Sequence, residues 1–280
     1  MKKIVICIGL VLAVGVAAAI HYNEEKMFEI RFSLGKNIVA TAKGTGIPTF
    51  NIDDVDGSIE YSALQLPLTV PVVYDHPEHE IKVQSVFSLT LNADRRRTAD
   101  DIVHHASISI SGKQIKSHAA GRAFTDEIIA QFSGGKWKRY IPASCPAVTG
   151  RSSFLNKSGD IDSTSCAIDP HYKFKSEEWL QLFSRTRNFE WIGEGILAKL
   201  SVGYDEDIRG ITYNIRITFD DYKTKIDADS ENEKRDKTSG DEKGWKSSEK
   251  AEASLVKLIA RIKVLEDNAV KRGDTLIPRQ

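Results

Sequence analysis

The stretch ILAKLSVGYDEDIRGITYNIRITF, residues 196–219, decides the fold because it shows the strand period twice, on either side of a turn. Apolar residues occupy every second position from Ile196 to Tyr204 and again from Ile211 to Phe219, so each half has one apolar face. The acidic segment 205–210 ends in glycine and supplies the turn. The pattern predicts an antiparallel hairpin. Its solvent face should carry Thr212, Asn214, Arg216 and Thr218.

The same two-residue period recurs earlier in the chain. Extended segments are predicted over 27–34, 38–42, 59–63, 64–73, 81–91 and 107–111. Segment 38–42 is expected to be a short return strand, and Pro67 and Pro71 make their own segment an edge or irregular strand. A change of period predicts short helices over 124–132 and from an N-cap at Ser176. We therefore expect an α+β fold with a predominantly antiparallel β-sheet, a few short helices and a C-terminal amphipathic helix.

The chain changes character after residue 226. Residues 227–248 are charged and rich in serine, with Trp245 as their one large apolar side chain. They cannot bury enough surface to offset the entropy of ordering, so a polar linker or long loop is predicted. Apolar residues then recur at spacings of four and three over 249–272, which predicts a helix that Gly273 ends.

The apolar stripe of this last helix has two interpretations. The helix either docks on its own domain, or it joins a second copy or captures a partner; the repeat is too short for a clear coiled coil. A tryptophan isolated in a charged linker has no local core and favours contact with another surface. The candidate partner-binding residues are Trp245, Leu255, Leu258, Ile262 and Leu265.

An export signal opens the chain. Lys2 and Lys3 precede an uncharged apolar run, 4–20, of the kind that secretion or insertion machinery reads. Small residues at 17–19 offer a cleavage site, whereas the run is only a little shorter than the ~20 residues that span a bilayer. Residues 1–20 are thus a signal peptide or an inner-membrane anchor. Residues 21–226 form an exported β-rich domain of one or two subdomains, periplasmic and either soluble or tethered.

Cysteine usage agrees with export. Outside Cys7 the chain has only Cys145 and Cys166, both within the loop-like segment 142–170. An oxidising compartment lets them pair, and closing about twenty residues would stabilise the fold by roughly 3 kcal/mol. The alternatives are two free thiols or a catalytic thiol.

Charge and motifs exclude several function classes. Lysine plus arginine, 39, equal aspartate plus glutamate, 39, so no global field attracts nucleic acid. The sequence has no G-x-S-x-G elbow and no phosphate-binding loop, so we predict no catalytic residues, no enzyme and no cofactor. A dispersed thiol site that combines Cys145 or Cys166 with a histidine such as His171 stays open as an alternative.

The histidines do not match a metal-ligand pattern. His76 and His79 flank a Pro-Glu turn instead of sharing a helical face, and the adjacent His104 and His105 should point to opposite sides of a strand. The acidic run 53–56 fails the register of a calcium loop. We therefore predict no metal site and expect solvated loop histidines.

These expectations favour a non-enzymatic envelope protein that binds another protein. Its most concrete form is a bacterial immunity or inhibitor protein that neutralises a toxin or hydrolase acting in the periplasm. The alternatives are an envelope hydrolase with a dispersed active site and a membrane-anchored structural or assembly protein. The sequence leaves the oligomeric state open.

Overall fold

The computed structural model describes residues 29–161, 166–227, 230 and 248–279. The predicted export segment 1–20 and most of the linker 227–248, with Trp245, lie outside the described residues. Within the described ranges, no helix combines the length and the apolar character needed to cross a membrane.

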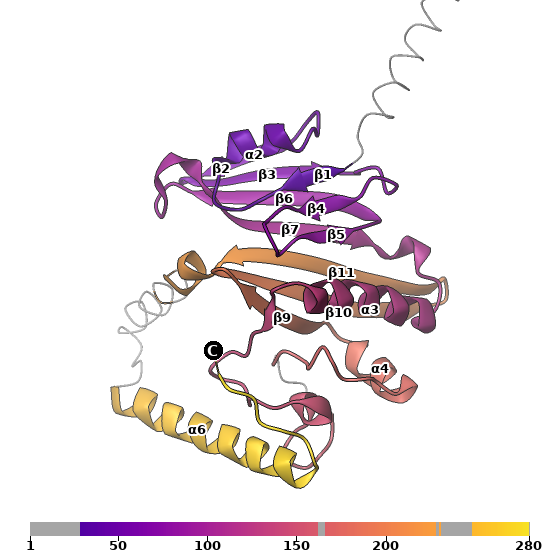
Figure 1. Cartoon of the computed structure of the whole chain (residues 1–280), viewed down its shortest axis with the longest axis vertical. Helices are drawn as coiled ribbons and strands as arrows, with labels where there is room; N and C mark the ends of the chain where they lie inside the picture. The colour runs from indigo at the N-terminus through magenta and orange to yellow at the C-terminus, as the bar shows by residue number, and fades with distance from the viewer. Residues whose placement is uncertain (1–28, 162–165, 228–229, 231–247, 280) are drawn as a thin grey trace, which may run out of the picture.

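Two sheets form the body of the protein (Figure 1). The larger one has eight antiparallel strands in the order β2-β3-β6-β7-β11-β10-β9-β8. Their bounds are Asn51–Val55 (β2), Ser58–Leu64 (β3), Val86–Asp94 (β6), Val103–Ser111 (β7), Lys138–Arg139 (β8), Arg187–Gly193 (β9), Ile196–Asp207 (β10) and Gly210–Asp221 (β11). The smaller sheet joins β1 (Ile30–Phe32), β4 (Val72–Tyr74) and β5 (Ile81–Val83), with β1 parallel to β4. The predicted α+β fold with a predominantly antiparallel sheet is confirmed.

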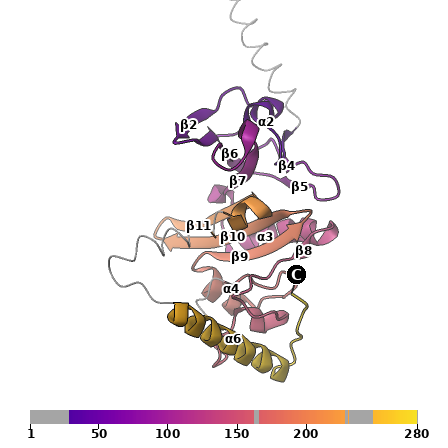
Figure 2. The ribbon, with the colours of Figure 1, turned by 90° about the vertical axis from the view of Figure 1, so that its left-hand side faces the viewer.

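The helices are α2 (Ile38–Gly44), α3 (His118–Gly134), α4 (Ser176–Phe183) and α6 (Ser248–Lys271), with short 3-10 turns η1 (Ala99–Asp101), η2 (Gly112–Gln114) and η3 (Gly150–Phe154). Figure 1 and Figure 2 place α6 at the end of the molecule opposite β2, beyond β9. The C-terminal helix is therefore separated from the sheet centre by the segment that follows β8.

The predicted hairpin is confirmed as β10 and β11. The strands pair from Ile196 opposite Asp221 to Asp207 opposite Gly210, which makes the hairpin longer than the sequence pattern indicated. The polar face differs at one position, because Thr218 is only 8% exposed. Thr218 sits at the sheet centre, opposite Lys199 on one side and Ser107 on the other, so its neighbours cover it.

One face of the large sheet carries the aromatic core. Phe219 of β11 stacks on Tyr74 of the small sheet with ring centroids 4.1 Å apart, and Trp191 of β9 stacks on Phe132 of α3 at 4.0 Å. These contacts fix the small sheet and α3 on the same face.

Segment 38–42 was predicted to be a return strand, and this prediction is wrong: it forms α2. The side-chain oxygen of Asn37 accepts hydrogen bonds from the backbone N–H groups of Val39 and Ala40, at 3.0 and 3.2 Å. This N-cap starts the helix, which then buries Ile38 and Ala42 on one face. The β-branched residues that suggested a strand are thus overruled by the cap and by packing.

Three other elements differ from the sequence pattern. Helix α3 begins at His118, six positions before the predicted 124–132, because the Ser117 hydroxyl accepts from the Ala120 N–H at 3.2 Å. Ser176 is the first residue of α4 and not its cap; the Glu178 carboxylate accepts from the Lys175 N–H at 3.0 Å instead. Strand β9 was not predicted at all.

Candidate functional site

The predicted disulfide between Cys145 and Cys166 is confirmed, with 5.6 Å between the two Cα atoms. It closes the segment that follows β8, here called the disulfide loop (145–166). While this bond holds, neither sulfur is available as the nucleophile of a thiol hydrolase. The alternative site with His171 therefore has no thiolate in this structure.

A buried arginine connects the disulfide loop to the sheet. Arg139 of β8 donates from Nη1 to the backbone oxygen of Val148 at 2.7 Å, and its Nη1 lies 4.0 Å from Asp169 Oδ1. Burial lowers the pKa of the Arg139 guanidinium, and the Asp169 carboxylate opposes that change. The group stays charged and holds the loop backbone against the sheet edge.

Helix α6 packs on the disulfide loop. The predicted helix over 249–272 is observed as Ser248–Lys271, and Ile262, Leu265 and Ala269 are all buried on one side of it. Past its end, Gly273 adopts φ +92° and the Asp274 N–H donates to the Ala269 oxygen at 3.0 Å. Of the two interpretations from the sequence, the structure shows docking on the helix's own domain.

The second half of α6 and the tail are fixed to the loop by polar contacts. Glu266 Oε1 accepts from the Ala147 N–H and from Arg279 Nη2, both at 2.9 Å. Arg279 also donates to the Cys145 oxygen at 2.8 Å, and the Thr149 N–H donates to the Thr275 oxygen at 2.9 Å. All these contacts involve Glu266 or later residues, so these polar contacts fix the C-terminal end of α6 and the tail to the disulfide loop.

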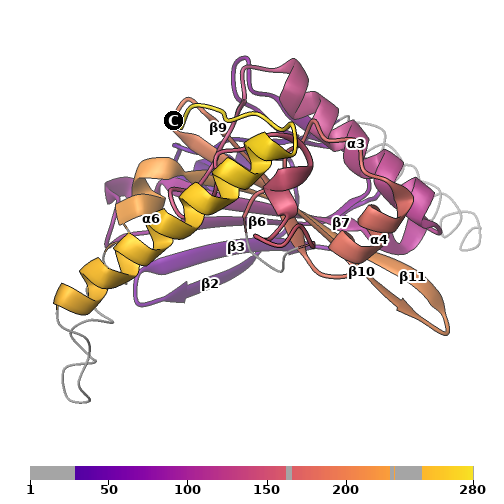
Figure 3. The ribbon, with the colours of Figure 1, turned by 90° about the horizontal axis from the view of Figure 1, so that it is seen from below.

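The first half of α6 presents apolar side chains to solvent. Leu255, Val256 and Ile259 keep 55%, 61% and 57% of their surfaces exposed, and Val264 in the second half keeps 47%. Figure 3 shows this end of the helix extending beyond the strands. Contiguous exposed apolar side chains of this kind are typical of an interaction site.

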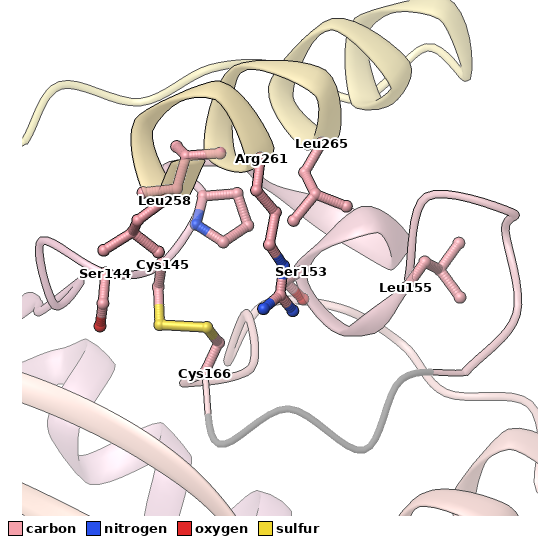
Figure 4. A pocket seen from close by; sticks show the side chains of 10 residues that line it. Ser144, Cys145, Ser153, Leu155, Cys166, Leu258, Arg261 and Leu265 are labelled. Atoms are coloured by element: carbon pink, nitrogen blue, oxygen red, sulfur yellow. A yellow bond between two sulfur atoms is a disulfide. The ribbon is translucent and has the colours of Figure 1, made fainter. Parts of the chain in front are cut away.

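Two grooves lie beside the middle of the helix, between residues 258 and 265. The first, of about 230 Å³, lies between α6 and the disulfide loop, where Figure 4 shows Leu258 and Arg261 above Ser144 and the disulfide. The second, of about 560 Å³, is lined by Lys157, Arg261 and Val264 among others. We call Leu255, Val256, Ile259 and Val264, together with the two grooves, the α6 surface.

The charge around the α6 surface is positive. Lys257, Arg261 and Lys263 lie within 253–265, a segment without acidic residues, and Lys263 pairs with the Asp267 carboxylate at 3.3 Å. Lys157 adds a further cation to the second groove. The α6 surface therefore combines exposed apolar side chains with a basic fringe.

The structure divides the residues that the sequence proposed for partner binding. Leu255 is exposed on the α6 surface and Leu258 is half-buried in the first groove, whereas Ile262 and Leu265 are each 8% exposed because they pack on the domain itself. Val256 and Val264 were missed. The signal that could have found them is that they are apolar and lie outside the predicted stripe. A helix that packs on its own domain needs only one apolar face, so further apolar residues indicate a second contact.

Several of the described histidines have structural partners. His105 Nδ1 lies 2.7 Å from Asp220 Oδ1, and His118 Nδ1 lies 3.0 Å from the Tyr213 hydroxyl. Burial lowers the pKa of His104, which keeps that ring neutral near neutral pH. His79 differs from the expected solvated histidine because it is 2% exposed, and it lies with His76 beside Glu194.

Comparisons with protein-family models, with curated proteins and with solved structures returned no match. The functional argument therefore rests on the geometry and chemistry of the α6 surface.

Proposed function

We propose that this chain is an exported, non-enzymatic protein of the bacterial envelope, either soluble in the periplasm or tethered through residues 4–20, that binds and inhibits a toxin or hydrolase acting there. The observation that carries the binding role is the α6 surface, where Leu255, Val256 and Ile259 are each more than half exposed. The absence of a catalytic motif from the sequence favours an inhibitor over an enzyme.

The exposed side chains can supply a substantial part of a binding energy. Full burial of a large aliphatic side chain contributes about 1.5–3 kcal/mol, so the exposed halves of Leu255, Val256 and Ile259 offer about 1 kcal/mol each or slightly more. Ordering costs are small, because the helix backbone already has its bound conformation. Three adjacent anchors on a rigid helix are typical of the central contacts of an interface.

The shape of the site supports recognition of a cleft. A helix that extends beyond the strands and carries apolar side chains can enter a groove on another protein, as amphipathic helices do in helix-in-groove complexes. The basic fringe that includes Lys257 and Lys157 would then meet acidic groups at the rim of that groove. Occupying the substrate cleft of a hydrolase in this way would inhibit it.

Photocrosslinking tests the location of the binding surface. A benzophenone amino acid is placed at Val256 or Ile259. The control position is Ile208, an apolar residue that is fully exposed and lies in the β10–β11 turn. We expect one discrete protein to crosslink in envelope fractions from positions 256 and 259 and not from 208. Crosslinks only between copies of this chain would instead show self-association and contradict the proposal.

An inhibition assay tests the second half of the proposal. The crosslinked protein is purified without this chain, and its hydrolytic or toxic activity is measured with increasing amounts of the wild-type chain. We expect the activity to fall to its minimum at a fixed molar ratio, and the Leu255→Glu/Ile259→Glu variant to require a large excess. A partner whose activity is unchanged at saturation would refute the inhibitor role.

A further inference from the structure

Three potential metal ligands converge at a place far from the α6 surface. His76 and His79 lie in the turn between β4 and β5, and Glu194 lies in the turn between β9 and β10. Ligand atoms of the three side chains are all within 4.8 Å of one another, and His76 Nε2 is 3.8 Å from Glu194 Oε2. Two imidazoles and one carboxylate form a ligand set that Zn²⁺ uses when its fourth position is left open.

The two imidazoles are held in the same way. Nδ1 of His76 lies 3.2 Å from the backbone oxygen of Pro77, and Nδ1 of His79 lies 3.0 Å from the same oxygen. An Nδ1–H that donates to a carbonyl leaves the lone pair on Nε2. Histidines that bind a metal through one ring nitrogen usually donate from the other nitrogen in this way. Both rings therefore present Nε2 as the ligand atom.

The ring of His79 is fixed from two sides. It makes an edge-on contact with Trp137, with centroids 5.0 Å apart, while Trp137 Nε1 donates to the His79 oxygen at 3.2 Å. On the other side, a Cβ atom added to Gly193 would lie 2.5 Å from His79 Nε2. Only glycine lets the β9–β10 turn approach the imidazole this closely, and that approach brings the next residue, Glu194, to the site.

The backbone and a neighbouring hydroxyl give further support. Glu194 has φ +46° and Gly195 has φ +79°, so Glu194 occupies a left-handed turn position that glycine, asparagine and aspartate normally fill. Tyr74 stacks on His76, and its buried hydroxyl has no hydrogen-bond partner among the described residues.

We propose that His76 Nε2, His79 Nε2 and the Glu194 carboxylate bind one Zn²⁺ ion. A tetrahedral site with ligands at about 2.0–2.1 Å needs ligand atoms roughly 3.4 Å apart. The spacing of His76 and Glu194, 3.8 Å, has to shorten by a few tenths of an ångström, and the other spacings, which are at most 4.8 Å, by no more than about 1.4 Å. The ion would connect the small sheet to the large one, because its ligands come from a turn of each. Binding the ion should therefore stabilise the contact between the two sheets, and its fourth position stays open to water.

Titration calorimetry on chelator-treated protein, with ZnCl₂ as the probe, tests the site. We expect one Zn²⁺ per chain, and a dissociation constant raised at least about 100-fold in His76→Ala and in Glu194→Gln, since even outer contacts of a metal site are worth 10–100-fold. At Zn²⁺ near 100 times the dissociation constant, the Tm of the wild type should rise by roughly 5–10 °C. His79 is not substituted because its ring is part of the core.

The matched control is His118→Ala/Glu206→Gln. His118 Nε2 and Glu206 Oε2 are also 3.8 Å apart, but no third described ligand is grouped with them. This control should bind Zn²⁺ like the wild type. Binding that is equal in the wild type, Glu194→Gln and His76→Ala would show an adventitious ion only and overturn the proposal, and so would the absence of a one-to-one isotherm.

Discussion

Removing the disulfide should destabilise the protein by an amount that the structure allows us to estimate. The bond joins residues separated by 21 positions, and for that separation the chain-entropy relation gives about 3 kcal/mol at room temperature. The double variant Cys145→Ala/Cys166→Ala should therefore lose about 3 kcal/mol of unfolding free energy. At a urea m-value of about 3 kcal/mol/M, which suits a chain of this size, the urea midpoint falls by about 1 M.

The loss should be greatest at the end of the molecule where α6 docks. Ile262 and Leu265 are buried over the disulfide loop, and the C-terminal tail pairs with the same loop at Thr149. Hydrogen exchange of α6 amides should therefore accelerate in the double variant, while β7 and β11 at the sheet centre keep most of their protection.

The controls separate the bond from the side chains. Ser144→Ala changes an exposed neighbour and keeps the bond, so it should alter stability by less than about 0.5 kcal/mol. Wild-type protein under reducing conditions should match the double variant. A loss below about 1 kcal/mol with an unchanged m-value would refute the reasoning, because it would mean that Arg139 and the tail hold the loop without the bond.

Three further predictions concern the fold. Hydrogen bonds from Arg96 lower the pKa of Asp94 to about 2 from 3.8, so the stability from this ion pair is fully present above pH 4 and is lost as the pH falls towards 2. Asp94→Asn should therefore cost about 1–2 kcal/mol at neutral pH in urea unfolding, and a difference that persists at pH 2 would contradict this. Asn37→Ala should cost about 1 kcal/mol or more because α2 loses its cap and the bond from Asn37 Nδ2 to the Asp100 oxygen is lost. Asn37→Asp loses only the second bond and should be less destabilised; equal losses would count against the cap. Gly121→Ala should destabilise by about 1–3 kcal/mol in thermal unfolding, since the added Cβ would lie 2.2 Å from the Tyr213 ring, and a stabilised variant would show that the ring can move.

Much of the fold follows from local patterns. The β10–β11 hairpin is predictable because its alternation runs uninterrupted through both strands, and register then follows from the turn. Strand β9 offers only Phe189 and Trp191 as large alternating residues before Gly193, too few to distinguish it from a loop. Helix α2 depends on the cap from Asn37, which competes with the strand preference of its β-branched residues.

The candidate site is only half predictable. The spacing of Leu258, Ile262 and Leu265 predicts the buried side of α6. Which of its other apolar residues stay exposed depends on where the helix docks, and it docks on a loop that lies much earlier in the chain. Glu266, for example, accepts from the Ala147 N–H across a separation of 119 residues. No local pattern encodes such a contact.

The cluster of His76, His79 and Glu194 is a sharper case of the same limit. The spacing of the two histidines on a turn gave no reason to expect a ligand set, and Glu194 lies in a distant hairpin. The approach of Gly193 to the His79 ring brings the third ligand into place, and only the tertiary structure shows it.

The affinity between this chain and its crosslinked partner tests the central claim most directly. Isothermal titration is performed with the wild type, with Leu255→Glu/Ile259→Glu and with the control Ile208→Glu, whose substituted residue is exposed in the β10–β11 turn. Losing two apolar anchors and burying two carboxylates should weaken binding at least about 100-fold, whereas the control should bind like the wild type. An unchanged dissociation constant for the α6 variant would contradict the account.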